Sequence, residues 1–460
     1  MPRTRTLLLL FGDILILFSS YLLTAYVLIS LGWFADLDFA SFITYENGLI
    51  RISIVVTTLI LGIYFVGMYE QIRLKTRRIL LEDLMLVMGV TFLIQAFISY
   101  SRTGFDISRW MMLFGSALAI ALMMCWRIAY SEILLRVVGN RKVLFFADSS
   151  LSRRLANHIE AHPEIGYAVV GFVSETPETD FPTRKVLTDS ETLLDQIIAL
   201  EPDRIVVSPN LKADDAISQA LQKCSMWGMR VENVGDLFED IFHRVSLETV
   251  TLNQLVFSPA FRPKGWVVFS QAIYGRLLAL AGILVTWPIM LLTAIAVKLD
   301  SEGPALLRQV RIGKGGERFE FLKFRSMYVD ADKISGPVRA QENDRRITRI
   351  GKWIRLTRID ELPQFINVLR GEMTLVGPRP EMPELEAKLL KDIPLYPQRY
   401  RVKPGITGWA QINHEPEDST ANTVKKLEYD LFYIKNMSPG MDLLTMFHTF
   451  KAVMMRIGAR

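Results

Sequence analysis

The chain has 460 residues, which is more than one ordinary domain requires, and half of them are hydrophobic. Its mean hydropathy of +0.24 is typical of a membrane protein and argues against a wholly soluble one. The only two cysteines, Cys125 and Cys224, are too few for a disulfide framework or a cysteine zinc cluster. Both are therefore predicted to be reduced packing residues.

The first third of the sequence contains four apolar segments of about the length that a bilayer requires, at 7–32, 52–69, 84–100 and 110–130. The loop after the first segment is acidic and has no Lys or Arg, whereas basic residues precede the first segment and cluster between the second and third. Because basic loops stay in the cytoplasm, both ends of this region are predicted to be cytoplasmic. Residues 1–136 should therefore form a four-helix transmembrane bundle.

Residues 141–250 alternate between strand and helix patterns. Strands are predicted at 142–147, 167–173, 204–208 and 229–234, and helices at 151–162, 190–200 and 212–225. This order predicts a small, mainly parallel sheet of the Rossmann type. A dinucleotide site would need a glycine-rich loop after the first strand, but Phe146-Ala-Asp-Ser-Ser-Leu-Ser152 contains no glycine. We therefore expect a degenerate Rossmann-like α/β domain that serves packing, dimerisation or regulation and binds neither NAD nor a UDP-sugar.

A fifth apolar stretch, from Leu277 to Val297, contains Trp287-Pro288 near its middle. As a plain span it would carry the rest of the chain to the other side of the membrane. As a helix broken at the proline, it would enter and leave by the same face, with Arg276 and Lys298 both at that face. Proline kinks also occur in true spans, so the residues alone leave both interpretations open.

Basic residues recur through the last third of the chain, and the whole chain has a pI of about 9.0. Residues 341–358 mix arginines with isoleucines and Trp353, a pattern typical of an amphipathic helix at a membrane surface. The glycine-interleaved basic run 308–318 is interpreted as an interfacial turn against anionic lipid rather than a nucleotide site. An apolar helical stripe over 443–457 fits the interface as well as it fits a core. No nucleic-acid recognition fold accompanies these charges, so we expect no nucleic-acid partner.

A pair of adjacent carboxylates, Asp360 and Glu361, stands just ahead of a predicted short helix. Pro363 fits the first turn of that helix and Gly371 its end, so both carboxylates should lie where backbone N–H groups favour negative charge. Arg379 follows closely, between two prolines. Carboxylates that can attack phosphorus or bind a divalent cation, beside an arginine that can hold phosphate oxygens, are typical of a phosphoryl-transfer site. An ordinary helix cap is the competing interpretation of the same pair.

Five blocks of residues set this pair in a wider pattern. They are Phe321-Leu-Lys-Phe-Arg-Ser-Met327, Arg358-Ile-Asp-Glu-Leu-Pro-Gln-Phe365, Arg370-Gly-Glu-Met-Thr-Leu-Val-Gly-Pro-Arg-Pro380, Lys403-Pro-Gly-Ile-Thr-Gly-Trp-Ala-Gln-Ile-Asn413 and Glu428-Tyr-Asp-Leu-Phe-Tyr433. In this order over residues 264–460 they closely resemble the bacterial sugar transferases that pass a hexose-1-phosphate from a UDP-sugar to polyprenyl phosphate. Residues 1–263 resemble the N-terminal extension of the larger members, which start exopolysaccharide or O-antigen (lipopolysaccharide) synthesis. The resemblance implies an α/β catalytic domain that hangs on a re-entrant membrane helix at about 276–298.

The resemblance also implies roles for the candidate site residues. Asp360 would be the nucleophile and Glu361 its partner, and the two would hold Mg²⁺ together with diphosphate oxygens. The candidates for substrate binding are Arg379, Lys323, Arg325 and Asp430. Lys323 and Arg325 lie two residues apart on a predicted strand, so their side chains would point to one face and could reach a nucleotide diphosphate.

The implied protein lies in the bacterial cytoplasmic (inner) membrane as a multi-pass protein, with its catalytic domain on the cytoplasmic face. It would transfer a hexose-1-phosphate from a UDP-sugar donor to polyprenyl (undecaprenyl) phosphate through a phospho-sugar aspartate and release UMP. UDP-glucose and UDP-galactose are the first donors to test, and an N-acetylated hexosamine is next. Expected partners are membrane lipids and a second copy of the chain in a homodimer. The competing class is a non-catalytic membrane scaffold, which leaves the carboxylate pair and the Pro-Arg-Pro sequence without a role.

Overall fold

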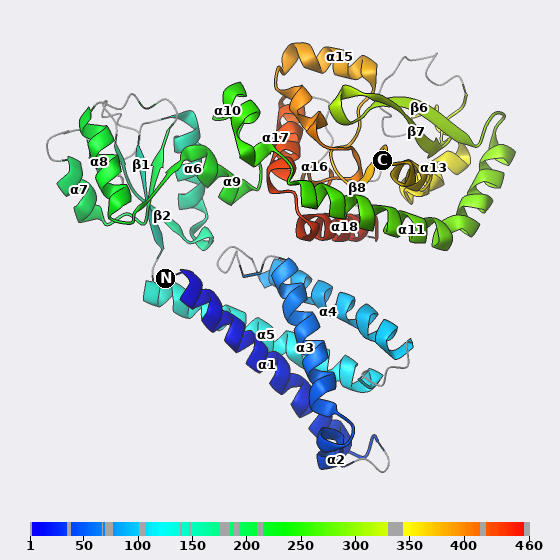
Figure 1. Ribbon diagram of the computed structural model, residues 1–460, viewed down its shortest axis with the longest axis horizontal. Helices are drawn as coiled ribbons and strands as arrows, with labels where there is room; N and C mark the ends of the chain where they lie inside the picture. The colour runs from blue at the N-terminus through cyan, green and yellow to red at the C-terminus, as the bar shows by residue number, and fades with distance from the viewer. Residues whose placement is uncertain are drawn as a thin grey trace. The chain divides into compact units, whose positions relative to one another are not determined.

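The computed structural model describes residues 2–34, 38–66, 68–69, 77–100, 107–138, 140–146, 149–173, 185–187, 193–208, 211, 215–329, 344–414 and 420–454. The chain divides into two compact units, Met1–Glu232 and Asn233–Arg460, and each unit has its own hydrophobic core (Figure 1).

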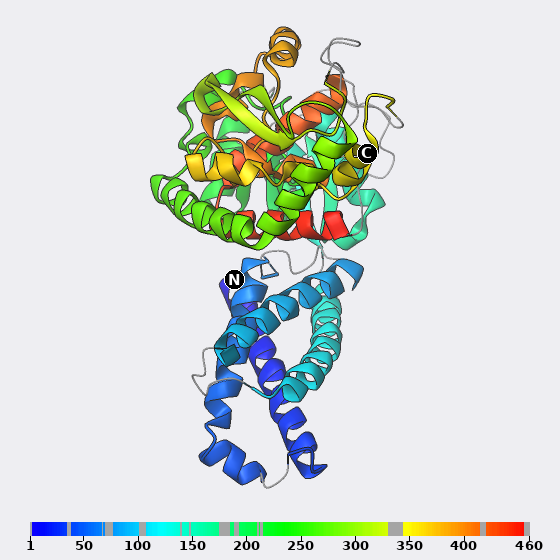
Figure 2. The ribbon, with the colours of Figure 1, turned by 90° about the vertical axis from the view of Figure 1, so that its right-hand side faces the viewer.

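Helices alone build the first part of the N-terminal unit. They are α1 (Pro2–Ser30), α2 (Phe39–Thr44), α3 (Gly48–Phe65), α4 (Arg77–Tyr100) and α5 (Arg109–Val138). The four long helices form a ring in which α1 and α4 each contact both α3 and α5 (Figure 2). Stretches of α1, α4 and α5 are long and apolar enough to cross a membrane, and α3 contributes a shorter apolar stretch, Gly48–Tyr64. The four apolar segments seen in the sequence are therefore helices of one bundle.

A buried ion pair ties the first helix of this bundle to the last. Arg127 of α5 pairs with Asp13 of α1, and both side chains are almost fully buried. Trp126 Nε1 donates to Asp13 Oδ1 at 3.0 Å, and Arg127 Nη1 donates to the Met68 carbonyl at 3.0 Å. Because charges removed from water are tolerated only when they are paired and hydrogen-bonded, this contact fixes how α1 and α5 pack.

The second part of the N-terminal unit is an α/β domain. Its elements are β1 (Arg141–Phe146), α6 (Ser150–Ala161), η1 (Pro163–Ile165), β2 (Tyr167–Val173), β3 (Lys185–Leu187), α7 (Leu193–Leu200), β4 (Arg204–Val207), α8 (Asp215–Met226) and β5 (Arg230–Asn233). The strands lie in the order β3-β2-β1-β4-β5, and β1 pairs in parallel with both β2 and β4. This order, running outward from β1 on both sides, is that of doubly wound sheets.

Helices cover both faces of this sheet (Figure 1). Leu144 and Phe146 of β1 pack with side chains of α7 and α8, among them the buried Cys224. In the loop after β1, residues 147–148 lie outside the described residues. The following helix α6 starts at a serine cap, because Ser149 Oγ accepts from the Ser152 amide at 3.1 Å. A serine cap, not a glycine turn, thus begins the helix that would face a dinucleotide.

The boundary between the units falls earlier than expected. We expected residues up to 250 in the middle domain, but the segment 233–250, with α9 (Val234–Phe242), packs in the C-terminal unit. Lys435 Nζ lies 2.9 Å from Glu239, and the Val245 amide donates to the Glu428 carbonyl at 3.1 Å. Strand and helix periodicity continues across the boundary, so only these long-range contacts reveal which unit the segment joins.

The C-terminal unit combines many short elements with one long helix. They are α10 (Leu252–Phe257), η2 (Pro259–Phe261), α11 (Gly265–Asp300), β6 (Leu306–Ile312), η3 (Lys314–Gly316), β7 (Arg318–Phe324), α13 (Arg349–Leu356), η4 (Ile359–Glu361), α14 (Gln364–Arg370), β8 (Thr374–Val376), α15 (Pro383–Asp392), η5 (Tyr396–Arg401), β9 (Gly405–Thr407), α16 (Trp409–Asn413), α17 (Thr420–Asn436) and α18 (Pro439–Met454). β6 and β7 form an antiparallel hairpin, and β8 pairs in parallel with β9. Side chains from α11, α14, η5 and α17 meet in one core.

Helix α11 contains Pro288 inside it, and both of its ends pack on the same folded unit. Near its start, Gln271 Nε2 donates to Asp442 Oδ2 at 2.7 Å. At its end, Asp300 Oδ2 accepts from the Ile350 amide at 3.0 Å. In Figure 1 the first part of α11 runs along the lower edge of the unit and the last part turns upward, as a proline kink allows. Both ends of α11 are thus held by one unit, and the stretch Pro259–Asp300 is long and apolar enough to enter a membrane.

The apolar surface of α11 is left open by this packing. Leu284, Val285 and Leu292 are 65%, 75% and 67% exposed, although the helix lies against the unit at both ends. Exposed aliphatic side chains in such number mark a surface that meets lipid or another protein. Leu443 and Phe450 on α18 are also exposed.

The amphipathic helix expected at 341–358 is shorter than predicted. Residues 341–343 lie outside the described residues, and α13 covers only Arg349–Leu356. Ile354 packs with Val297 and Phe324 in a small core, whereas Trp353 is 66% exposed. Ile350 and Ile354 therefore attach the helix to α11 and β7 instead of facing outward. Of the apolar stripe predicted over 443–457, Ile457 lies outside the described residues.

The position of the α11 ends can be tested by cysteine labelling. In a background with Cys125 and Cys224 changed to Ser, we expect Arg262→Cys and Glu302→Cys to be shielded alike from a membrane-impermeant thiol reagent in intact cells, because both ends share one side. Both should react after permeabilisation. Glu46→Cys, in the loop predicted to lie outside, serves as the labelled control. Labelling of position 302 alone in intact cells would mean a full span.

Candidate active site

The carboxylate pair lies in a tight turn between two helices. α13 ends at Leu356 with Thr357 as its C-cap, and Arg358, whose φ of 55° is left-handed, is the N-cap of the 3-10 turn η4 (Ile359–Glu361). Pro363 takes the N-cap position of α14, one residue before the first turn in which we expected it. Gly371 ends α14 as predicted, with a φ of 78° that glycine adopts without strain.

Glu361 is held by the arginine of the Pro-Arg-Pro sequence. Arg379 Nη2 donates to Glu361 Oε1 at 2.9 Å, across 18 residues of sequence. Burial is the largest single influence and opposes ionisation of Glu361. The charge and hydrogen bond of Arg379, together with the charges of Arg358 and Lys323, outweigh burial and hold the pKa of Glu361 below its ordinary value. Glu361 therefore bonds the phosphate-binding candidate instead of capping α14.

Asp360 has the opposite electrostatic character. Burial, and then the adjacent Glu361 charge, raise the pKa of Asp360 to about 6, although Lys323, Arg355 and Arg379 act against the shift. The two neighbouring carboxylates thus differ, because Glu361 is kept ionised whereas Asp360 has a pKa of about 6, close to neutral pH. Pairs whose pKa values are pushed apart in this way are typical of catalytic sites.

Lys323 lies beside this pair, on β7. Burial and the nearby Arg311 lower the pKa of Lys323 to about 8, while Asp360 acts in the opposite direction. Arg355 of α13 also acts on both Lys323 and Asp360. The site therefore gathers cations from the β6–β7 hairpin, α13 and the Pro-Arg-Pro sequence around two carboxylates, an arrangement suited to a polyphosphate.

Arg325 does not lie with Lys323 beside the carboxylate pair. β7 ends at Phe324, so the two-residue alternation that would align Arg325 with Lys323 stops before it. Its side chain is buried, and Nη2 donates to the Ser301 carbonyl at 2.7 Å, while Nη1 bonds the Glu302 carbonyl. Arg325 thus binds carbonyls at the end of α11, and its expected contact with the diphosphate is corrected.

Asp430 also lies in the interior, where it binds another arginine. Arg399 Nη2 lies 2.8 Å from Asp430 Oδ2 and donates to the Arg379 carbonyl at 2.8 Å. Arg399 Nη1 donates to the Tyr396 hydroxyl at 2.6 Å and lies 3.7 Å from Glu381. Because Asp430 is only 2% exposed, it acts on the site through Arg399 and not as a substrate ligand. This corrects the sequence prediction for Asp430.

The sequence alone did not identify Arg399 as a functional residue. It belongs to the run Gln398-Arg-Tyr-Arg-Val-Lys403, whose charges look like those of an ordinary solvated turn. Arg311 and Arg355 were noticed only as surface charges. No local signal separates a buried arginine from an exposed one in such runs, because the partners come from distant segments.

A divalent cation fits the donor set of this site. Among the described residues, no three His, Cys, Asp or Glu side chains gather as a protein-only metal cluster would require. Asp360 and Glu361 supply two adjacent carboxylates. Mg²⁺ is typically held by one or two carboxylates, with substrate phosphates and water as its other ligands, so a two-carboxylate set suits it.

Comparison with known proteins places the two domains in families. A family model described as bacterial sugar transferase matches residues 267–456, which include the whole site. A family model described as CoA-binding domain matches residues 64–234.

Three of the curated relatives that align with more than half of the chain are transferases from different bacteria. A UDP-N-acetylgalactosamine-undecaprenyl-phosphate N-acetylgalactosaminephosphotransferase of Aeromonas hydrophila is 38% identical over 57% of this chain and 61% of the relative. UDP-glucose:undecaprenyl-phosphate glucose-1-phosphate transferases of Xanthomonas campestris pv. campestris and Klebsiella pneumoniae are 35% and 33% identical. They align over 63% and 68% of this chain, and over 62% and 67% of their own lengths. The chain thus spans about three fifths of the length of the first two relatives.

The raised pKa of Asp360 predicts an unusual modification profile. Carbodiimides react with protonated carboxyl groups, so in metal-free protein the Asp360 peptide should label up to about pH 6. In protein unfolded by urea the same peptide should stop labelling near pH 4, the ordinary range for aspartate. Peptide mass spectrometry measures both profiles. Identical profiles in folded and unfolded protein would contradict the shift.

The buried Arg399 network predicts a large stability loss in Asp430→Asn. Removing the negative charge leaves a buried guanidinium short of its partner, which should cost roughly 3 kcal/mol. That loss corresponds to a Tm lower by about 10 °C, measured on the detergent-solubilised chain. The control Glu320→Gln breaks the exposed 3.4 Å pair with Arg308 and should cost less than about 1 kcal/mol. Equal Tm values for the two variants would contradict the assigned role.

Proposed function

This chain belongs to the bacterial sugar transferase family, and from that membership we propose that it transfers a sugar-1-phosphate from a UDP-sugar to polyprenyl phosphate and releases UMP. The observation that carries the proposal is the pair Asp360 and Glu361, with pKa values shifted in opposite directions and with Lys323, Arg355 and Arg379 around it. In the cell this reaction would be the first membrane step of exopolysaccharide or O-antigen synthesis.

Binding of the donor uses the cations of the site. A UDP-sugar carries two phosphates, and Lys323 and Arg379 lie on different elements that converge on Asp360. Arg379 is 37% exposed in its side chain although it bonds Glu361, so part of its guanidinium remains open to a ligand. Arg399 holds the Arg379 carbonyl, which fixes the direction of that side chain. These residues neutralise the diphosphate and orient the sugar-bearing phosphate toward Asp360.

In the first step, an Asp360 carboxylate oxygen attacks the phosphorus that carries the sugar. A bond forms between that oxygen and phosphorus, and the bond from phosphorus to the UMP oxygen breaks, so UMP leaves with the electron pair. Lys323 and Arg379 stabilise the charge on the phosphate oxygens during this exchange. Asp360 must be ionised to attack, and with a pKa of about 6 it is mostly ionised at neutral pH.

In the second step, an oxygen of polyprenyl phosphate attacks the same phosphorus. The bond between phosphorus and Asp360 breaks, and the carboxylate returns to its starting state while polyprenyl diphosphate-sugar leaves. Glu361 stays ionised beside Arg379 and keeps that arginine in place through both steps. One site serves the two substrates in turn.

Asp360 and Glu361 would also hold Mg²⁺ when it is bound. The ion would supply charge neutralisation for the diphosphate and for the leaving UMP.

The proposed position at the membrane rests on α11. We propose that α11 is re-entrant and that the site lies at the cytoplasmic face, where UDP-sugars are available. Support comes from the two ends of α11, which pack on one unit, and from its exposed apolar side chains between them. This arrangement brings a water-soluble donor and a lipid acceptor to one site at the interface.

The mechanism predicts a burst of UMP without acceptor. Enzyme mixed with donor alone should release about one UMP per active site and then stop, and the phospho-sugar should map to Asp360 by mass spectrometry. Asp360→Asn keeps the shape but loses the anion, so both burst and adduct should vanish. Arg379→Ala should slow the burst by about 100-fold through loss of a phosphate contact. Asp392→Asn, on the exposed end of α15, is the matched control and should behave as the unchanged chain.

The outcomes separate the competing interpretations. Full turnover by Asp360→Asn, or UMP release only when donor and acceptor are both present, would contradict the covalent step and favour direct transfer. A scaffold would release no UMP and make no labelled lipid with any donor. A panel of UDP-glucose, UDP-galactose and UDP-N-acetylhexosamines identifies the donor by the size of the burst.

A further inference from the structure

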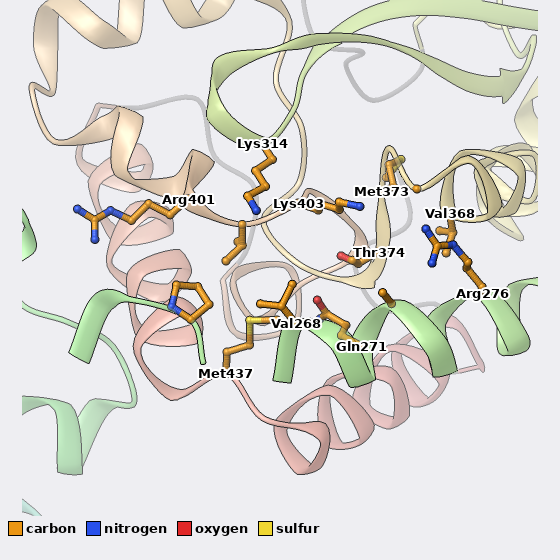
Figure 3. A pocket seen from close by; sticks show the side chains of 14 residues that line it. Val268, Gln271, Arg276, Lys314, Val368, Met373, Thr374, Arg401, Lys403 and Met437 are labelled. Atoms are coloured by element: carbon orange, nitrogen blue, oxygen red, sulfur yellow. The ribbon is translucent and has the colours of Figure 1, made fainter. Parts of the chain in front are cut away.

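A pocket lies at the opposite end of α14 from the carboxylate pair. It has a volume of about 140 Å³, room for a group of several heavy atoms and not just one water. Val368 and Gly371 at the end of α14 line it, together with residues of α11, the β6–β7 turn and the segment before β9 (Figure 3). At about 1.5 Å per residue, the seven residues of α14 separate it from the carboxylate pair by about 10 Å.

Three cations converge on this pocket from three separate elements. Arg276 comes from α11, Lys314 from the turn between β6 and β7, and Lys403 from the segment before β9. In Figure 3 the amine of Lys314 points toward the pocket, and Lys403 extends toward Arg276. Across the part of the chain that the structure describes, none of these three side chains forms an ion pair with a carboxylate.

Arg401, which also lines the pocket, differs from these three. Its guanidinium points away from the centre in Figure 3. It donates from Nη1 to the Phe261 carbonyl at 3.1 Å and from Nε to Gln398 Oε1 at 2.8 Å. Arg401 therefore has a structural role, and the three remaining cations need another explanation.

The three cations repel one another. Burial, and then the charges of Arg276 and Lys314, lower the pKa of Lys403, and no acidic group acts against the shift. Gathering like charges in a partly buried place costs free energy unless an anion offsets it. A ligand with several negatively charged oxygens would do so, because each oxygen can accept a charge-assisted hydrogen bond.

Part of the pocket wall is apolar. Val268, Val368, Met373 and Met437 form this part, and Gln271 and Thr374 add polar groups beside it. Directly after Arg276, the helix continues with Leu277, which is 63% exposed. A cationic rim over an apolar wall, beside a helix with an exposed apolar face, matches an amphiphile with an anionic head.

We propose that this pocket binds a phosphate-bearing anion, held by Arg276, Lys314 and Lys403, as a site separate from that of the sugar donor. A lipid headgroup and free phosphate share this chemistry. The apolar wall and the neighbouring surface of α11 suit a lipid, whose first carbons would lie along Val268 and Met437. Bound there, the headgroup anchors α11 and the end of α14 at one depth in the interface.

The test uses the full chain in detergent, depleted of lipid, with no sugar donor and no polyprenyl phosphate, so its result is independent of the transfer reaction. Binding of dihexanoyl phosphatidylglycerol, dihexanoyl phosphatidylcholine and inorganic phosphate is measured by calorimetry. We expect saturable binding of phosphatidylglycerol that falls about tenfold for each amine removed, first in Lys314→Gln and then in Lys314→Gln/Lys403→Gln. Lys314 is exposed in a turn, so its single variant should fold normally, and an unchanged Tm checks this.

The control Lys391→Gln/Lys425→Gln removes the same charge from exposed positions elsewhere in the unit and should bind as the unchanged chain. Binding of phosphatidylglycerol well above that of phosphate identifies a lipid headgroup, and equal binding identifies free phosphate; both support the proposal. It is overturned if neither ligand binds, if the pocket and control variants weaken binding equally, or if UDP displaces the bound ligand.

Discussion

A single buried guanidinium, that of Arg399, must find its hydrogen-bond partners inside the C-terminal unit, because an unpaired buried charge would be very costly. Its partners are Asp430 of α17, Tyr396 of η5 and the carbonyl of Arg379. Satisfying one side chain therefore fixes α17, η5 and the Pro-Arg-Pro sequence together. Arg379 then reaches Glu361, holds it ionised, and leaves Asp360 beside a fixed negative charge. The unequal carboxylate pair is the end of a chain of contacts that begins in the core.

The same arrangement lowers the stability of the folded state once Asp360 is ionised. The pKa of Asp360 is raised to about 6, so the folded protein holds this proton more tightly than an unfolded chain does. From about pH 4 upward, ionisation of Asp360 therefore works against folding, and above pH 6 this cost is fully present. The core of the unit, with buried residues from α11, α14 and α17, offsets it. A reactive carboxylate at neutral pH is thus maintained by packing elsewhere.

Helix α11 links the candidate site to a broad exposed apolar surface. Its buried face carries Gln271 and Gly275, which pack on the unit, while its other face exposes a long series of apolar side chains. The basic pocket lies where that apolar face begins, and the carboxylate pair lies at the far end of α14, which packs along α11. The proposed membrane contact, the proposed anion site and the candidate active site are therefore connected through the short helix α14 and its packing along α11. A change in the depth of α11 in the membrane would therefore affect all three.

The sequence by itself determined what depends on neighbours in the chain. Segment length and hydropathy set the apolar helices, strand periodicity placed β2 at Tyr167–Val173, and Gly371 marked the end of α14. The adjacent pair Asp360 and Glu361 was visible because both members lie in one motif. Only the tertiary structure decided that Arg325 binds carbonyls at the end of α11, that Asp430 serves Arg399, and that segment 233–250 joins the C-terminal unit. The physical reason is burial. The sequence around a charged residue looks the same whether water or a distant partner satisfies its charge, and only packing brings that partner near.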